Sequence, residues 1–144
     1  MKVALFGGTG FVGSYITDEL LEHKHKPKLL VRENSTKKLL EADKCDITEG
    51  DLSNHEAVKK LIKSADVVIY SIGLVREFPH RGITFQETQF EGVKQTVDLA
   101  SEFNIKRYIL ISANGAKLDG TKYQSTKYLA EEYLKHSKLE WTIF

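Results

Sequence analysis

The chain has little cysteine, little proline and no long hydrophobic run. Its only cysteine, Cys45, cannot form an internal disulfide, which fits a reducing compartment. No apolar stretch approaches the ~20 residues that a membrane span requires. Glycines interrupt the apolar N-terminus too early for a signal peptide. We therefore expect a cytoplasmic protein with no membrane partner.

The chain also lacks an excess of charge of either sign. It has 21 basic and 20 acidic residues and a net charge of +1, so no overall field would recruit nucleic acid. The histidines and the single cysteine do not form a cluster with metal-ligand spacing, so we expect no metal site. Binding must therefore depend on a local site for a small molecule.

What the chain does have is enough apolar sequence for one folded domain and a regular alternation of patterns. Its 144 residues are 41% hydrophobic. Short apolar runs typical of strands alternate with segments of helical spacing. This alternation predicts an α/β fold with a doubly wound parallel sheet in three layers, a Rossmann fold, in strand order 3-2-1-4-5-6 and as a single domain over 1–144. The strands are expected at 3–6, 28–31, 44–48, 66–72, 107–112 and 139–144, and the helices at 11–22, 35–42, 54–63, 84–103 and 122–136.

A glycine-rich turn lies between the first predicted strand and the first predicted helix, in the sequence FGGTGFVG. In such a turn one glycine permits the tight bend, another lets the backbone approach a pyrophosphate, and a third lets helix and strand pack closely. The helix N-terminus adds free N–H groups and a positive dipole end. A turn without a ligand is the alternative. The expected dinucleotide contacts are Gly7, Thr9, Gly10, Phe11, Val12 and Gly13.

The GxxGxxG spacing of this turn resembles the extended and atypical short-chain dehydrogenase/reductase superfamily, which includes NmrA-like and NAD-dependent epimerase/dehydratase-like proteins. Later motifs match in order: VRENS, GDLS, YSIG, ISANGA and YQSTK. The resemblance covers essentially the whole chain. It implies an NAD(P)-binding domain with the chemistry of an oxidoreductase, an epimerase or a dehydratase.

Arg32 bears on the choice of cofactor. It lies about 20 residues beyond the glycines, where a Rossmann fold reads the adenosine ribose. An acidic residue there suits the ribose hydroxyls of NAD, whereas arginine suits the 2′-phosphate of NADP. The neighbouring Glu33 could instead offer its carboxylate, and a solvated surface arginine is the plain alternative. We expect NADP, with NAD as the second choice.

Two further segments complete the predicted cofactor site. The resemblance implies that Asp51 and the main chain of Leu52, in GDLS, meet the adenine. Asp51 is equally suited to a turn or a helix cap. The resemblance also implies that the backbone at Ser71, Ile72 and Gly73 packs against the cofactor, although ordinary strand termination would explain these residues too.

Tyr123 and Lys127 are four residues apart on a predicted helix and so share one face. The resemblance implies that Tyr123 is the general acid or base for a carbonyl or alcohol. Lys127 would hold the ribose hydroxyls and lower the pKa of the Tyr123 phenol, which is otherwise near 10. Ser112 would bind the substrate oxygen. A chance pair, with Tyr123 as a packed aromatic, is the alternative.

The chain departs from the family pattern at two places. Gln89 stands where extended members commonly carry asparagine, and the chain ends after WTIF, so we expect the substrate-binding segment to be missing. Two hypotheses remain: an NADP-dependent enzyme acting on an unknown small-molecule substrate, and a non-catalytic NADP(H)-binding sensor or structural module. Either could be a fragment of a longer protein. The open edge of the last strand leaves a homo-oligomer open.

Overall fold

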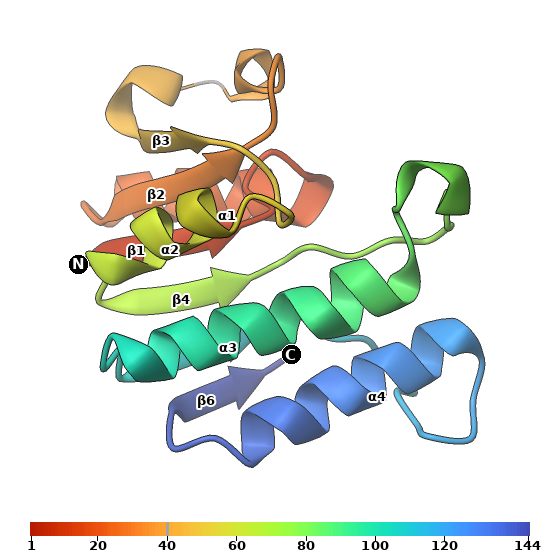
Figure 1. The fold of residues 1–144 in the computed structure, drawn as a ribbon. Coiled ribbons are helices and arrows are strands. Elements are labelled where there is room, and N and C mark those ends of the chain that lie inside the picture. The colour runs from red at the N-terminus through yellow and green to blue at the C-terminus, as the bar shows by residue number, and fades with distance from the viewer. Residues whose placement is uncertain (40) are drawn as a thin grey trace.

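A six-stranded parallel sheet forms the centre of the computed structural model, which describes residues 1–39 and 41–144 apart from the side chain of residue 38. The strand order is β3-β2-β1-β4-β5-β6 (Figure 1), which confirms the predicted doubly wound topology. Every neighbouring pair is parallel. The strands are β1 (Lys2–Phe6), β2 (Lys26–Val31), β3 (Asp46–Glu49), β4 (Val67–Tyr70), β5 (Arg107–Leu110) and β6 (Glu140–Ile143).

One face of the sheet is covered by α2 (His55–Lys63), α3 (Gly92–Glu102) and α4 (Lys122–Lys135), which lie side by side in Figure 1. Fully buried aromatic side chains of the sheet, Phe6, Tyr70 and Tyr108, pack under these helices. Asn54 begins α2 as predicted, because its side-chain oxygen accepts the N–H of Ala57. This face therefore holds the larger of the two cores.

The other face is covered by α1 (Phe11–Glu22), whose Ile16 and Leu20 pack on a smaller core of β1, β2 and β4 residues. The helix predicted over 35–42 is not formed. Two 3-10 helices stand there, η1 (Thr36–Lys38) and η2 (Ala42–Lys44), and residue 40 lies outside the described residues. The segment is short, mostly polar and lacks a side-chain cap at Ser35, so little tertiary packing supports an α-helix.

The long helix predicted over 84–103 begins with a π-helical segment, η4 (Gln86–Glu91), before continuing as α3. Its position is fixed by Tyr70 of β4. The Tyr70 hydroxyl donates to the Thr88 carbonyl, and a Cβ on Gly92 would overlap that hydroxyl. A π-helical turn changes the direction of side chains locally and is frequent at functional sites.

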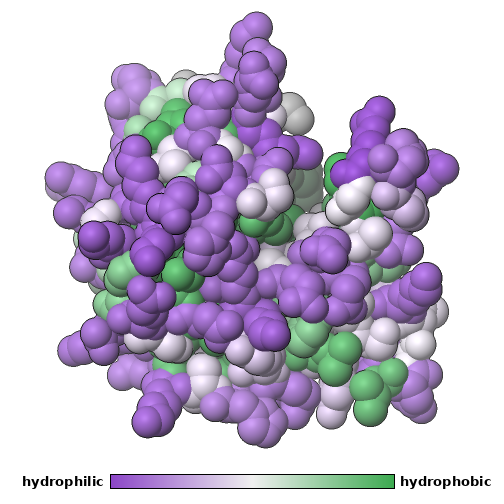
Figure 2. Space-filling model, in the orientation of Figure 1, coloured by the Kyte–Doolittle hydropathy of each residue, from purple (hydrophilic) through white to green (hydrophobic). Residues whose placement is uncertain are grey.

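The strand order reverses between β1 and β4, because the chain crosses from β3 past β2 and β1 to reach β4. In such sheets ligands bind outside the carboxyl ends of the strands at this point. A loop at residues 74–84, which includes η3 (Pro79–Arg81), projects from the same edge (Figure 1). Figure 2 shows the surface hollowed between this loop and the part of the molecule built by β1, β2 and β3. None of the helices that the structure describes is both long enough and apolar enough to cross a membrane.

Candidate functional site

The turn after β1 is built so that only glycine fits at two of its positions. Gly7 has φ of 90°, and a Cβ on it would lie 2.9 Å from the carbonyl carbon and oxygen of Ser71. A Cβ on Gly13 would overlap the Gly7 carbonyl oxygen. The N–H of Gly10 closes the turn by donating to that same oxygen at 2.9 Å. The turn is therefore pressed against both α1 and the end of β4.

The first turn of α1 leaves its N–H groups free for an anion. Gly10 is the N-cap with extended backbone, and no side chain caps this helix end in the described structure. No acidic residue stands in the first turn to repel a phosphate. Thr9 is half-buried in the turn beside it. The geometry is that of an anion-binding helix N-terminus.

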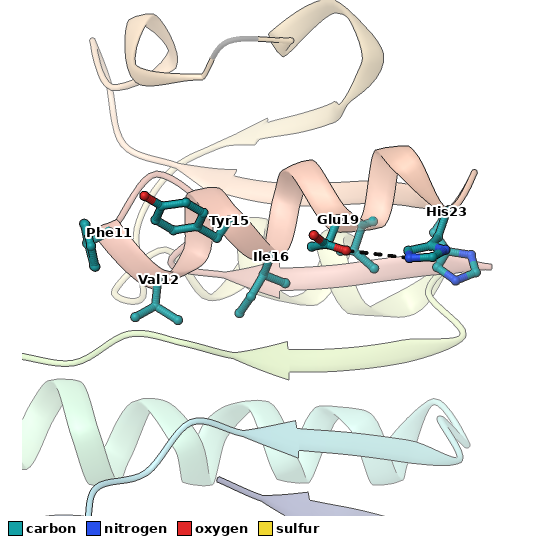
Figure 3. A pocket seen from close by; sticks show the side chains of 8 residues that line it. Phe11, Val12, Tyr15, Ile16, Glu19 and His23 are labelled. Atoms are coloured by element: carbon teal, nitrogen blue, oxygen red, sulfur yellow. Dashed lines mark ion pairs between the residues drawn. The ribbon is translucent and has the colours of Figure 1, made fainter.

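The side chains of Phe11 and Val12 are 81% and 47% exposed and point away from the core. They stand at one end of a groove of about 380 Å³ that runs along α1 to His23. Figure 3 shows Val12 and Ile16 lining this groove, with the ion pair between Glu19 and His23 near its far end. Only the beginning of the groove adjoins the glycine turn. Phe11 and Val12 therefore contribute backbone N–H groups, rather than side chains, to the anion site at the start of α1.

Arg32 and Asp51 follow the neighbouring strands β2 and β3, and both side chains are exposed. The Asp51 carboxylate accepts the N–H of Ser53 at 2.9 Å and the Ser53 hydroxyl at 2.5 Å. These hydrogen bonds, with a smaller contribution from the Arg32 charge, lower the pKa of Asp51. The Asp51 carboxylate thus stabilises the turn after β3. Leu52 packs on the core and lies close to Gly92.

The end of β4 forms a wall shared by the glycine turn and α4. The N–H of Ser71 donates to Phe6 at 2.9 Å, and the buried Ser71 hydroxyl has no hydrogen-bond partner among the described residues. Ile72 packs on the core. Gly73 faces Lys127, because a Cβ on Gly73 would lie 3.7 Å from the lysine Nζ. The structure therefore brings the glycine turn, the end of β4 and α4 together at the switch point.

These residues fit the pyrophosphate part of a dinucleotide. Glycine at positions 7 and 13 lets the turn pack directly against the Ser71 backbone and against the start of α1, and the first N–H groups of α1 are uncapped. The Ser71 hydroxyl beside the turn is a buried donor that lacks an acceptor within the described part of the chain. Arg32 supplies positive charge at the end of the next strand.

Lys127 is buried on α4, with only 4% of its surface exposed. Its Nζ donates to the Ile111 carbonyl at 3.1 Å. Burial lowers the pKa of Lys127 to about 8, and the nearby Glu131 carboxylate opposes this shift. The amine is therefore held near the strand ends and loses its proton at a lower pH than an exposed lysine does.

Ser112 does not meet Tyr123 through a hydrogen bond. The Ser112 hydroxyl donates to Glu131 at 2.5 Å, and Glu131 lies eight residues beyond Tyr123, about 12 Å along the axis of α4. The Tyr123 ring is half-buried and packs edge-on against Phe85, with ring centroids 5.6 Å apart. Within the described residues no hydrogen bond joins Tyr123 to Ser112 or to Lys127, although α4 carries both Tyr123 and Lys127 as predicted.

Two residues of this region had not been assigned a role from the sequence. Gln89 is 1% exposed; its side-chain N–H donates to the Leu74 carbonyl at 3.1 Å, and its oxygen accepts the Thr126 hydroxyl at 3.5 Å. The Glu131 carboxylate accepts a hydrogen bond from the Ser112 hydroxyl. The spacing of four residues from Lys127 places Glu131 next to it on α4 and could have indicated it.

No group of three or more side chains of the types that ligate metals gathers anywhere in residues 1–39 and 41–144.

Several known proteins to which this chain is similar carry the names of reductases. The isoflavone reductase homolog A622 of Nicotiana glauca is 35% identical over 80 residues, which are 50% of this chain and 26% of the relative. The ceramide reductase of Caulobacter vibrioides is 28% identical over 115 residues, 80% of this chain and 35% of the relative. The chain thus spans about a third or less of these relatives.

Among solved structures, the Bordetella bronchiseptica enzyme WbmH in complex with NAD⁺ has the same fold. The TM-score is 0.85 at 21% identity, over 99% of this chain and 54% of that one. The family described as NAD(P)H-binding matches residues 7–144, a range that contains the glycine turn, the end of β4 and α4. From this match and from the cradle at the switch point, we conclude that the chain belongs to the NAD(P)H-binding family.

Proposed function

We propose that the chain binds NADP(H) at the glycine turn and uses it to reduce a carbonyl compound. The observation that carries the proposal is the turn itself, where Gly7 and Gly13 leave no room for a side chain and the N–H groups of α1 remain free. The reductase names of the relatives from Nicotiana and Caulobacter support the direction of the chemistry.

The preference for NADP over NAD rests on Arg32. Its guanidinium stands exposed at the end of β2, where a ribose 2′-phosphate would be bound. The Asp51 carboxylate, expected near the adenine, is engaged with Ser53. Glu33 is exposed beside Arg32 and is the remaining acceptor for NAD.

The proposed reaction uses residues of α4. A reduced dinucleotide held at the glycine turn would supply a hydride to the substrate carbon. Tyr123 gives its phenolic proton to the substrate oxygen. Lys127, buried beside Gly73, binds ribose hydroxyls and favours the tyrosinate that results. Ser112 remains the third residue predicted for the catalytic site, although its hydroxyl donates its hydrogen bond to Glu131.

A second candidate is a module that binds NADP(H) without turnover. It is favoured by the hydrogen bonds that Lys127 makes to Ile111 and Ser112 makes to Glu131, which engage two predicted catalytic groups elsewhere. Both candidates share the cofactor site, and they differ only in whether Tyr123 acts on a substrate.

The test combines binding and turnover. Wild type and Tyr123→Phe are titrated with NADPH and NADH and then assayed for NADPH oxidation with a panel of aldehydes and ketones. We expect both proteins to bind NADPH, wild type to reduce at least one carbonyl, and the variant to lose that activity. Binding without turnover would favour the second candidate, and equal turnover by both proteins would refute the role of Tyr123.

A further inference from the structure

The loop between β5 and α4 brings a different polar residue than Ser112 to the level of Tyr123. Ser112 contacts Glu131, in the third turn of α4. Gly115, only three residues later in the chain, contacts Gln124, whose side-chain N–H donates to the Gly115 carbonyl at 3.1 Å. Glu131 lies seven residues beyond Gln124 on α4, about 10 Å along the axis. The loop therefore runs alongside α4 from the level of Glu131 toward the N-terminal turn of the helix.

A tight turn holds this part of the loop in place. The N–H of Ala116 approaches the Ala113 carbonyl at 3.4 Å, with Asn114 and Gly115 between them. Gly115 has φ of 80°, a conformation that favours glycine at the second central position of such a turn. Gln124 also forms the capping box of α4 with Thr121. The side chain that donates to the Gly115 carbonyl is therefore itself held in place.

Asn114 is the polar side chain at the tip of this turn. It is exposed, and no side-chain hydrogen bond engages its amide within the described residues. The Ser112 hydroxyl, in contrast, uses its one O–H to donate a hydrogen bond to Glu131 at 2.5 Å, so its oxygen can only accept further hydrogen bonds. A carbonyl oxygen that gains negative charge during reduction requires a donor. Of the two residues, only Asn114 has N–H groups to offer.

We propose that Asn114, rather than Ser112, donates the hydrogen bond that holds the substrate oxygen beside Tyr123. This assignment rests on the proposed reductase function. Asn114 exchanges no proton in the reaction: the carbonyl oxygen gains its proton from Tyr123, the carbonyl carbon gains a hydride from the reduced dinucleotide, and solvent reprotonates Tyr123. The substrate class is a carbonyl compound whose oxygen reaches the first turn of α4.

The experiment compares three variants of the whole chain, Asn114→Asp, Asn114→Ala and Ser112→Ala. The probes are NADPH with 4-nitrobenzaldehyde and with 9,10-phenanthrenequinone. Aspartate keeps the shape and the turn preference of asparagine but cannot donate when ionised. We expect both Asn114 variants to lose about 10- to 100-fold in kcat/KM with the Kd of NADPH unchanged, and Ser112→Ala to stay within about threefold of wild type.

Turnover at reduced pH adds a readout that a merely structural role would not change. Protonation restores a donor to aspartate, so kcat/KM of Asn114→Asp relative to wild type should rise as the pH falls toward the ordinary carboxyl pKa near 4. Wild-type turnover that survives in both Asn114 variants but is lost in Ser112→Ala would overturn this inference and leave the proposed function standing. A wild type that binds NADPH and reduces neither probe would overturn the inference together with the catalytic part of the proposed function.

Discussion

At the scale of single residues, the burial of Lys127 lowers the free energy of unfolding at neutral pH. Its ammonium is buried with one hydrogen bond, to Ile111, and burial lowers its pKa from 10.5 to about 8. Between these two values the unfolded chain binds more protons at this residue than the folded chain does. The contribution of Lys127 to the free energy of unfolding therefore rises with pH through this window, and below pH 8 its burial is unfavourable by about 3 kcal/mol.

Replacing Lys127 with methionine should therefore stabilise the protein at neutral pH. The expected gain is about 1 to 3 kcal/mol in the free energy of unfolding, because the loss of the hydrogen bond to Ile111 offsets part of the relief. Urea unfolding of wild type and variant at pH 7, 8 and 9 measures it, and the gain should shrink as the pH rises. An unchanged or growing difference would contradict the account.

The same variant tests the cofactor role of Lys127. Lys127→Met should weaken NADPH binding, whereas Lys28→Met, which removes another buried lysine, should leave NADPH binding unchanged. Lys28 donates to Leu61 and Ser64 under α2 and supports the fold alone. If both variants bound NADPH as wild type does, Lys127 would have no part in the cofactor site.

Arg32 is predicted to separate the two cofactors. Arg32→Ala should weaken NADPH by about tenfold or more, because a charge-assisted hydrogen bond to phosphate contributes ~1.5 to 3 kcal/mol, and should barely affect NADH. Arg107→Ala is the matched control, since Arg107 is an exposed arginine that begins β5 and pairs with Glu140. Equal losses for NADPH and NADH at one ionic strength would refute the phosphate-binding role.

At the scale of elements, the π-helical segment η4 depends on a side chain from a different part of the chain. The hydroxyl of Tyr70 in β4 donates to the carbonyl of Thr88 in η4, 18 residues later. Gln89, also in η4, donates to the Leu74 carbonyl. Tyr70→Phe should reduce the free energy of unfolding by about 1 to 3 kcal/mol, since it leaves a carbonyl without its donor. Urea unfolding should show no comparable loss for Tyr15→Phe, an exposed tyrosine on α1; equal stabilities of both variants would argue against this contact.

Elements were predictable where local signals agreed with the tertiary structure. In α2 the Asn54 cap and the inward apolar spacing coincide, and the helix forms as predicted. The helix predicted over 35–42 had no side-chain cap at Ser35, and among the described residues the segment forms two separate 3-10 turns, Thr36–Lys38 and Ala42–Lys44. The π-helical start of the helix over 84–103 could not be predicted, because it depends on a contact between distant residues.

At the scale of the whole molecule, the parallel topology explains why the segments of the candidate site could be grouped without a structure. Once the strand order is known, the segments that follow β1, β2, β4 and β5 must meet at one edge. The sequence could not show which side chains point at one another there. Ser112 donates a hydrogen bond to Glu131, and Gly115 in the loop that follows accepts one from Gln124, because of side-chain conformations that no spacing encodes.

The central claim, that the glycine turn holds a dinucleotide phosphate, is tested most directly by calorimetric titration of NADPH into wild type and Gly10→Ala. Gly10 has φ of −83°, and a Cβ there would lie 3.2 Å from the Gly7 oxygen, so alanine needs only a small adjustment while it blocks the approach of a phosphate to the backbone. We predict saturable binding to wild type and binding about tenfold or more weaker in the variant, with matching circular dichroism. Saturable binding of equal strength to both proteins, or no saturable binding of NADPH or NADH to wild type, would contradict the account.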